Sequence, residues 1–567
     1  MSRREKKEQK QSNKTIRKIV IVAIFLALIC LVFKYAPNYI RDDITDRTNL
    51  IVNNGNITKD LKKNIFVENG VTYISKEDIL NFFDPYIYYD EKYNQIITGG
   101  DTRIASIIVG EKTMNDNGTN VKIKASVIKK DDTYYIPFSE LDNIYNVKIE
   151  YIEGTNTVIV DSLNRKLEVA DISKNVGVKY INTAISRNVD KLERGDTVTL
   201  VNNSEKDGWI KVRTKNGKLG YVKENLLANR INIREEITTS KSKKVDGNIS
   251  MIWDYFSEYG EAPTRTEPLK GVNVVSPTFF TLKRLGKGEV EENVGNAGKA
   301  YIKWAHENKY QVWPSISNSA MIETTSEVMN DYKLRQGLIN KIVSLVVKYN
   351  LDGINIDFEN MYVEDKKLFS RFIIELAPRL NEIGAVLSVD VTAPDGSDTW
   401  SMCYDRHTIG KIADYIVFMA YDQNGITSPK EGTTAGCDWV EVNLKKFVET
   451  QEDIESNKVV LGMPFYTRVW WKNSNGKLES QAVDMKKLKD IIPSNANKVW
   501  DDNLKQYIAE YTKNGVKYKV WVEDEKSIEA KLNLIEKYNL AGAAYWKKGG
   551  ESQEIWNLID SKLKISN

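Results

Sequence analysis

Asp357 and Glu359 are the residues whose type and spacing best suit a chemical role. They lie in the segment LDGINIDFEN (351–360), in which apolar and polar residues alternate: Ile354, Ile356 and Phe358 against Asn355, Asp357 and Glu359. Alternation with a period of two predicts a strand with one buried face. Two carboxylates about 7 Å apart along one face raise each other's pKa. A glutamic acid kept protonated near neutral pH can protonate a departing oxygen, such as that of a glycosidic bond.

The last part of the chain alternates short apolar segments with helical patterns. Seven segments are strand candidates: GVNVVSP, YQVWPSI, LDGINIDFE, AVLSVDVTA, DYIVFMAYD, KVVLGMPF and LAGAAYW. Repeated βα units favour an α/β fold, and the count suits a (β/α)8 TIM barrel with one strand unplaced. A doubly wound sheet is the alternative, but no Gly-rich phosphate loop follows any strand. In a barrel, the Ile-Ile-Phe face packs on helices, and Glu359 lies at the carboxyl end of the strand, where barrel enzymes keep their active sites.

Three motifs of this region resemble glycoside hydrolase family 18, the chitinases and related endo-N-acetylglucosaminidases. Asp352 to Glu359 resembles the signature Asp-Gly-x-Asp-x-Asp-x-Glu of the fourth barrel strand and departs from it at Asn355. FMAYD resembles the strand-six motif and GAAYW the end of strand eight, which adds Met419, Tyr421, Asp422 and Trp546. The resemblance covers about 250 to 560, and we assign residues 248–563 to a catalytic barrel.

The resemblance implies a role for each motif residue. Glu359 would protonate the leaving oxygen while the substrate's own 2-acetamido oxygen attacks the anomeric carbon, so no protein carboxylate acts as nucleophile. Asp357 would orient the acetamido group and stabilise the cationic oxazolinium, and Tyr421 would donate to the acetamido oxygen. The remaining motif residues would bind substrate: Asp352, Asn355, Met419, Asp422 and Trp546, the last as the floor of the sugar site. No cofactor and no metal are implied.

Asn355 is the departure from the family pattern. An asparagine there can donate a hydrogen bond to Asp357 but cannot take up its proton. We expect an active enzyme, because members of the spore- and wall-lytic branch also resemble DGINIDFE. Whether proton sharing is altered stays open at this point.

The N-terminus predicts a membrane anchor. Residues 1–18 carry eight Lys or Arg against two Glu, and the apolar run that follows predicts a transmembrane signal-anchor over 19–36. The basic flank favours a cytoplasmic tail and an extracellular catalytic domain at the cell-wall side of the cell membrane. A cleaved signal peptide is the alternative, but no small-x-small site follows the run.

Two small domains are predicted before the barrel. Residues 71–98 and 133–160 repeat one order of elements: an aromatic strand, a short helix opened by Ser75 or Ser139, and a hairpin. This α+β region (50–165) resembles the N-terminal domain of copper amine oxidases, but it has no histidine, so no copper is implied. Residues 168–228 resemble a bacterial SH3-like barrel that binds wall peptides, with a spacer that uses Trp209 as core as the alternative. Residues 229–247 are predicted as a linker.

The overall composition excludes several classes of function. The 567 residues include 81 basic and 78 acidic side chains, a net charge of +3 that gives no argument for nucleic-acid binding. Two histidines and three cysteines make a zinc enzyme or a disulfide scaffold a poor fit, although one bond between Cys403 and Cys437 stays open. The sequence predicts no oligomeric state.

Peptidoglycan and chitin both supply the acetamido group that the implied mechanism needs. A tethered enzyme that faces outward behind a wall-type module meets peptidoglycan first. IWDYFSEYG, NVVSPTFF and YTKNGVKYKVWVEDEKSI also resemble the wall-lytic branch. We therefore expect cleavage after N-acetylglucosamine in peptidoglycan. The alternatives are a chitinase and a non-catalytic wall-binding protein on an inactive barrel.

Overall fold

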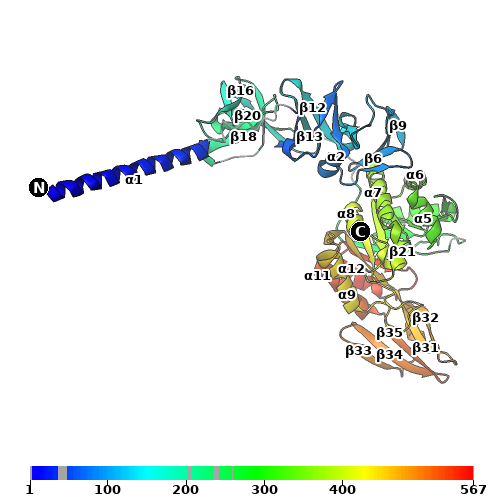
Figure 1. The fold of residues 1–567 in the computed structure, drawn as a ribbon. Helices are drawn as coiled ribbons and strands as arrows, with labels where there is room; N and C mark the ends of the chain where they lie inside the picture. The colour runs from blue at the N-terminus through cyan, green and yellow to red at the C-terminus, as the bar shows by residue number, and fades with distance from the viewer. Residues whose placement is uncertain (1–2, 36–46, 202–205, 234–241, 258–259, 566–567) are drawn as a thin grey trace. The chain divides into compact units, whose positions relative to one another are not determined.

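The computed structural model describes residues 3–35, 47–201, 206–233, 242–257 and 260–565. The chain divides into two compact units, Met1–Gly100 with Ala105–Thr238, and Asp101–Ile104 with Thr239–Asn567. The first holds the N-terminal helix and two small β-rich regions, and the second holds a barrel with an inserted sheet (Figure 1). Residue 36 of the predicted anchor and residues 234–241 of the predicted linker lie outside the described residues.

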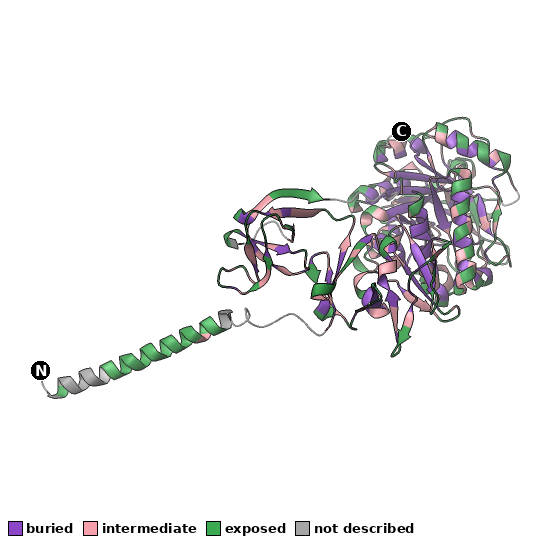
Figure 2. Cartoon of the chain, turned by 90° about the horizontal axis from the view of Figure 1, so that it is seen from above, coloured by how far each residue is buried: buried purple, intermediate pink, exposed green. Residues whose placement is uncertain are grey.

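The N-terminal helix α1 (Arg3–Tyr35) is long and apolar enough to cross a membrane. Its window Asn13–Val32 has a mean hydropathy of 2.6, and none of that window is buried against the rest of the protein. Figure 2 colours the described residues of this helix as exposed, apart from one intermediate residue. A helix of this kind is compatible with an anchor or with a secretion signal.

The predicted repeat is present in the first small region. Strands β4 (Val71–Ser75) and β11 (Thr133–Pro137) pair antiparallel, and each is followed by a short helix and a hairpin. The hairpins join β5 (Tyr88–Asp90) to β6 (Gln95–Gly99), and β12 (Val147–Ile152) to β13 (Thr157–Ser162), as predicted.

The two serines of the repeat have different roles. The Ser75 hydroxyl caps α2 (Lys76–Phe82) by accepting from the backbone N–H of Asp78 at 3.1 Å. The prediction for Ser139 is wrong, because α3 (Asp142–Tyr145) follows Leu141 without a side-chain cap. The Ser139 hydroxyl instead accepts from the backbone N–H of Thr72 at 2.9 Å and so links the two repeats.

The second small region is a seven-stranded antiparallel sheet. Its strands are β14 (Leu167–Ile172), β15 (Val176–Lys179), β16 (Asn188–Leu192), β17 (Thr197–Leu200), β18 (Trp209–Arg213), β19 (Leu219–Lys223) and β20 (Leu227–Ile233). Trp209 is buried, as expected of a core residue. Because β20 continues to Ile233, residues 229–233 are strand rather than linker.

The second unit contains a closed ring of parallel strands. In order around the ring these are β21 (Ile249–Asp254), β22 (Val274–Pro277), β25 (Gln311–Val312) with β26 (Ser315–Ser317), β27 (Gly353–Asp357), β28 (Val386–Val391), β29 (Tyr415–Met419), β30 (Val459–Pro464) and β36 (Gly542–Trp546). β25 and β26 are two halves of one strand that is interrupted at Pro314. The strand that the sequence left unplaced is β21, which directly follows the polar segment predicted as linker.

Helices enclose the ring and bury the outer faces of its strands. They are α4 (Gly295–Glu307), α5 (Ile322–Asn330), α6 (Tyr332–Tyr349), α7 (Lys366–Glu382), α8 (Arg406–Ile412), α9 (Cys437–Lys445), α11 (Glu525–Tyr538) and α12 (Ile555–Leu563). Phe358, directly after β27, stacks on Phe372 of α7 with ring centroids 5.9 Å apart. Ile354, Ile356 and Phe358 are all fully buried, so the predicted Ile-Ile-Phe face does pack on the helices. Figure 2 shows this concentration of buried residues in the barrel.

A five-stranded antiparallel sheet is inserted between β30 and α11, and sequence reasoning missed it. Its order is β32 (Leu478–Asp484), β31 (Tyr466–Lys472), β35 (Val516–Val522), β34 (Gln506–Lys513) and β33 (Asn497–Asp501). A short helix, α10 (Leu488–Ile491), contributes Leu488 to an apolar cluster with this sheet. The sheet continues directly from barrel strand β30 (Figure 1).

Candidate active site

Asp357 and Glu359 lie at the carboxyl end of β27, as the strand pattern predicts. The backbone of Glu359 is held on both sides by Asn318, which accepts from its N–H at 3.0 Å and donates to its C=O at 2.8 Å. The hydroxyl of Tyr404 donates to the carbonyl of Phe358 at 2.7 Å. Because these bonds hold the backbone rather than the carboxylates, the side chains of Asp357 and Glu359 remain free for chemistry.

Burial and mutual repulsion set the protonation of the two acids. Burial raises the pKa of Asp357 to about 6 although a hydrogen bond with Glu359 opposes the shift. The pKa of Glu359 is raised well above its usual value by burial, by the charge of Asp357, by their hydrogen bond and by Asp422. The pair therefore favours a neutral Glu359 beside an ionised Asp357 near pH 7.

Asn355, which could donate a hydrogen bond to Asp357, donates to other partners instead. Its Nδ2 donates to Asp390 Oδ1 at 2.7 Å and to the Ser388 hydroxyl at 3.2 Å, and its Oδ1 accepts from Trp253 Nε1 at 3.0 Å. Asn355 is fully buried, and its amide bonds to the neighbouring strand β28 on one side and to Trp253 of β21, which does not pair with β27, on the other. It therefore positions interior groups and does not offer its side chain to a substrate.

Asp390 is the acid that sequence reasoning missed. It lies on β28, where the register pairs Asn355 with Ser388 and Ile356 with Val389, which places Asp390 beside Asp357. Burial raises the pKa of Asp390 well above its usual value, with repulsion from Asp357 and Glu359 in the same direction. Among the described residues, Asp390 Oδ2 and Asp357 Oδ1 are buried without a hydrogen-bond partner. The signal was the polar alternation Ser388, Asp390 and Thr392 within AVLSVDVTA.

Tyr421 and Asp422 follow β29 at the same end of the barrel. Burial raises the pKa of Tyr421 well above 10, with charges that include Asp390 and Glu359 in the same direction, so its hydroxyl stays a neutral donor. Asp422 has a positive φ of 56° and accepts from the Tyr466 hydroxyl at 2.6 Å. Tyr466 begins β31 and was not predicted; it ties the inserted sheet to the site.

Trp546 ends β36 and lies in an aromatic group. Its ring centroid is 6.0 Å from that of Trp253 and 5.8 Å from that of Tyr255. Trp546 is only partly buried, so a face of the indole remains available to a sugar ring. Met419, the last residue of β29, is 5% exposed and acts mainly as packing at this end.

Asp352 does not join the other predicted site residues. It precedes β27 and therefore lies at the amino end of the strand, whereas Glu359 lies beyond its carboxyl end. Its carboxylate bonds to His306 Nε2 at 2.8 Å and accepts from the backbone N–H of Val312 at 2.9 Å. The assignment of Asp352 to substrate binding is corrected: it joins α4 and β25 to β27 at the amino end of the barrel.

The cysteines and acids suggest no metal site within the part of the chain that the structure describes. No group of three or more His, Cys, Asp or Glu residues there could hold a metal ion. Cys403 and Cys437 are both free and buried, so the disulfide that the sequence left open is not formed.

Comparison with known proteins gives two family matches. Residues 251–551, more than half of the chain, match the model of the glycosyl hydrolases family 18, and residues 51–160 match that of the copper amine oxidase N-terminal domain.

Individual relatives match the barrel region. A protein of Bacillus subtilis described as the uncharacterized glycosylase YvbX is 29% identical over 304 residues, 52% of this chain and 85% of that protein. The cortical fragment-lytic enzyme of the same species is 26% identical over 262 residues, 44% of this chain and 59% of its own length. The crystal structure of a chitinase from Chromobacterium violaceum has a TM-score of 0.48 at 23% identity and covers 56% of this chain and 100% of its own.

The buried acid Asp390 predicts a pH-dependent difference in stability between the protein and its Asp390→Asn variant. A carboxyl whose pKa is higher in the folded than in the unfolded chain contributes a loss of stability as pH rises from about 3.9 to the folded pKa. The loss reaches at most about 1.4 kcal/mol per pH unit. Asn cannot ionise, so between pH 4 and pH 7 the unfolding temperature of the variant should fall less than that of wild type. The exposed Asp398 provides the control Asp398→Asn, which should follow wild type; parallel losses in wild type and Asp390→Asn would contradict the assignment.

Proposed function

The chain belongs to the glycosyl hydrolases family 18, and we propose that this glycosidase is a membrane-anchored enzyme that cleaves β-1,4 bonds after N-acetylglucosamine in peptidoglycan. The observation that carries the proposal is the buried pair of Asp357 and Glu359 at the carboxyl end of β27. Its two members favour different protonation states, which is the condition for acid catalysis beside a stabilising anion.

The proposed first step breaks the glycosidic bond. Glu359 gives its proton to the leaving oxygen, while the acetamido oxygen of the substrate attacks the anomeric carbon from the opposite side. An oxazolinium forms, and its positive charge is stabilised by the ionised Asp357. Water, deprotonated by Glu359, then opens the ring, and two inversions give net retention.

The neighbouring residues supply orientation. The neutral hydroxyl of Tyr421 is suited to donate to the acetamido oxygen. Asp422 is held by Tyr466, which fixes one of its oxygens and leaves the other for a sugar hydroxyl. The available face of Trp546 suits the apolar face of a pyranose ring. Together these groups would hold the reacting sugar near its attacking geometry.

The choice of peptidoglycan rests on context. One relative is named a cortical fragment-lytic enzyme, and the match spans about three fifths of that protein's length. The seven-stranded sheet before the barrel, which resembles a bacterial SH3-like domain in sequence, would add retention at the wall. Chitin oligomers offer the same acetamido group and form the alternative substrate.

The anchor is proposed from α1 and its charge. Its apolar window is long enough for a bilayer core of about 30 Å, which takes about 20 residues. The basic residues at its start favour a cytoplasmic N-terminus, and with that orientation the barrel would lie at the wall side of the membrane.

Removal of the acid should abolish most of the activity. Glu359→Gln keeps the shape but has no proton to give, so turnover of glycans with poor leaving groups should fall at least ~100-fold. Purified peptidoglycan and chitin oligomers are both assayed by reducing-end analysis, which also identifies the sugar released. Glu364→Gln, at an exposed position after the strand, is the matched control. A Glu359→Gln enzyme within threefold of wild type would remove the assigned role.

Substrate assistance is tested with altered sugars. A substrate without the acetamido group should not turn over, and a thiazoline mimic of the cyclic intermediate should inhibit, because it resembles the species that Asp357 and Tyr421 are placed to bind. Asp357→Ala should weaken that inhibition. NMR should detect the β-anomer as the first product. An α-anomeric first product, or rapid cleavage of a non-acetylated glycan, is incompatible with this mechanism.

If α1 is an uncleaved anchor, the mature protein should retain its N-terminal residues. The full chain should remain in the membrane fraction and keep its first residues, whereas a variant with several Lys or Asp residues placed within 19–33 should not integrate. N-terminal sequencing and fractionation report both. Recovery of a soluble form that starts near residue 40 would show a cleaved signal instead.

A further inference from the structure

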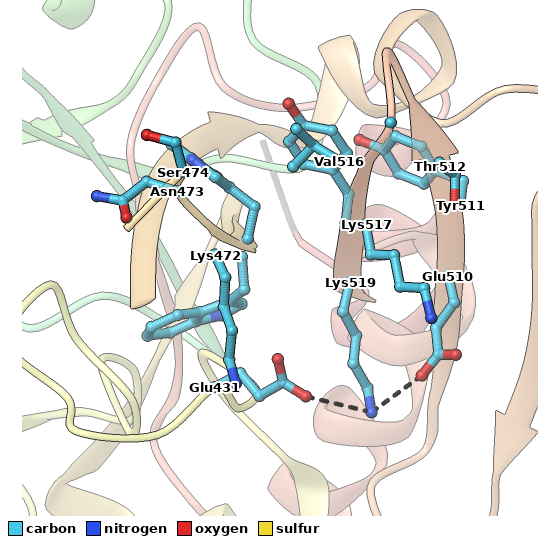
Figure 3. A pocket seen from close by; sticks show the side chains of 14 residues that line it. Glu431, Lys472, Asn473, Ser474, Glu510, Tyr511, Thr512, Val516, Lys517 and Lys519 are labelled. Atoms are coloured by element: carbon cyan, nitrogen blue, oxygen red, sulfur yellow. Dashed lines mark ion pairs between the residues drawn. The ribbon is translucent and has the colours of Figure 1, made fainter. Parts of the chain in front are cut away.

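A groove of about 830 Å³ opens between two hairpins of the inserted sheet. One wall is the β31–β32 hairpin around Lys472, Asn473 and Ser474, and the other is the β34–β35 hairpin from Glu510 to Lys519 (Figure 3). None of the lining residues belongs to the candidate active site. The groove is therefore a separate feature of the barrel unit.

The groove exists because two paired strands diverge. β31 and β35 are hydrogen-bonded only from Val469–Val520 to Trp471–Tyr518, although β31 continues to Lys472 and β35 begins at Val516. Beyond this point each strand pairs only with its own hairpin partner. An extended peptide fits such a gap, because it can lie along strand edges and bond to their backbone.

Aromatic side chains line the point of divergence, on the face of the sheet opposite to Lys517 and Lys519. Tyr518 stacks on Tyr511 with ring centroids 5.2 Å apart, and Trp471 is tilted against Tyr518 at 5.9 Å. Trp471 and Tyr518 are only partly buried, so they offer apolar surface to small side chains.

The charges of the groove leave a positive excess. Lys519 forms ion pairs with both acids of the lining, at 3.0 Å to Glu510 and 3.6 Å to Glu431 (Figure 3). Lys472 and Lys517 are exposed, and neither forms an ion pair within the described part of the chain. A ligand that complements the groove should therefore be extended and carry carboxylates.

We propose that this groove binds the carboxylate-bearing stem peptides of peptidoglycan. The proposal rests on peptidoglycan as the substrate and identifies which part of it this surface recognises. In peptidoglycan the lactyl carboxyl of muramic acid forms the amide bond to the stem peptide, so the substituted sugars are neutral, whereas the stem peptides carry free carboxylates on an extended backbone. Lys472 is six residues along β31 from Tyr466, which contacts Asp422, a distance of about 20 Å along the strand. A peptide bound here would hold its glycan strand against the barrel several sugars from the cleaved bond.

Direct titration of a stem peptide tests the proposal without relying on hydrolysis. The probe is the tripeptide L-alanyl-γ-D-glutamyl-meso-diaminopimelate, and calorimetry with the full chain in detergent micelles measures its Kd. Lys472→Gln with Lys517→Gln should weaken binding ~10-fold, because two contacts to charged groups are lost, and added salt should weaken wild-type binding. Lys498→Gln, an exposed lysine on β33 outside the groove, is the matched control and should bind as wild type does.

Rate measurements on the same variants show whether the groove recognises the stem peptide or the glycan. The double lysine variant should need a several-fold higher concentration of peptide-bearing glycan strands for half-maximal rate. It should hydrolyse peptide-free strands, with their lactyl carboxyls capped as amides, as wild type does. No tripeptide binding by wild type, or equal binding by the double variant, would overturn the proposal. An equal loss on peptide-free strands would show that the groove holds glycan, which also overturns it. If the tripeptide binds but peptidoglycan is not cleaved, the proposed activity fails and the groove assignment stands.

Discussion

The central constraint on this protein is the burial of three carboxyl groups at one end of a barrel. Asp357, Glu359 and Asp390 lie on or just after two neighbouring strands, and burial raises the pKa of each. Three buried negative charges in contact would be very unfavourable in a medium of low dielectric constant. The cluster is therefore stable only if it retains protons. Acid catalysis also requires a retained proton. Burial of the carboxyl groups therefore both costs free energy and keeps Glu359 in the protonated form that the proposed chemistry needs.

The surrounding structure holds these acids in place, and within the described part of the chain no Lys or Arg forms an ion pair with them. Asn318 and Tyr404 bond to the backbone around Glu359, while Phe358 is locked on the other side of the strand by aromatic stacking on α7. Asn355 fixes Asp390 and is itself fixed by Trp253 from β21. An amide stands where the family pattern has an acid on β27, and the third carboxyl group at this end of the barrel is that of Asp390 on β28. The negative charge of Asp357 adds to burial in raising the pKa of Asp390.

The sequence predicted most of the secondary structure that has a regular residue spacing, but few of the contacts between residues that are distant in the sequence. Alternation in LDGINIDFEN gave the strand, its buried face and the position of Glu359, because a period of two is a local property. The partners of Asn355 depend on other strands, which the motif alone does not encode. The amino-end location of Asp352, by contrast, follows from its position seven residues before Glu359 and could have been predicted. Ser139 has the same residue type as the true cap Ser75, yet its hydroxyl bonds to a strand of the other repeat. The inserted sheet was not predicted because its strands lie between β30 and α11 and interrupt the alternation of strand and helix from which the barrel was inferred.

The protonation of Glu359 at neutral pH is the central claim, and infrared spectroscopy measures it directly. The difference spectrum between wild type and Glu359→Gln at pH 7 reports the carbonyl stretch of a protonated carboxylic acid separately from that of a carboxylate. The account predicts that wild type shows a protonated acid band, which the variant lacks and which is lost only when the pH is raised well above the ordinary range of a glutamate. A carboxylate band for Glu359 at pH 7, with no protonated band that depends on this residue, would contradict it.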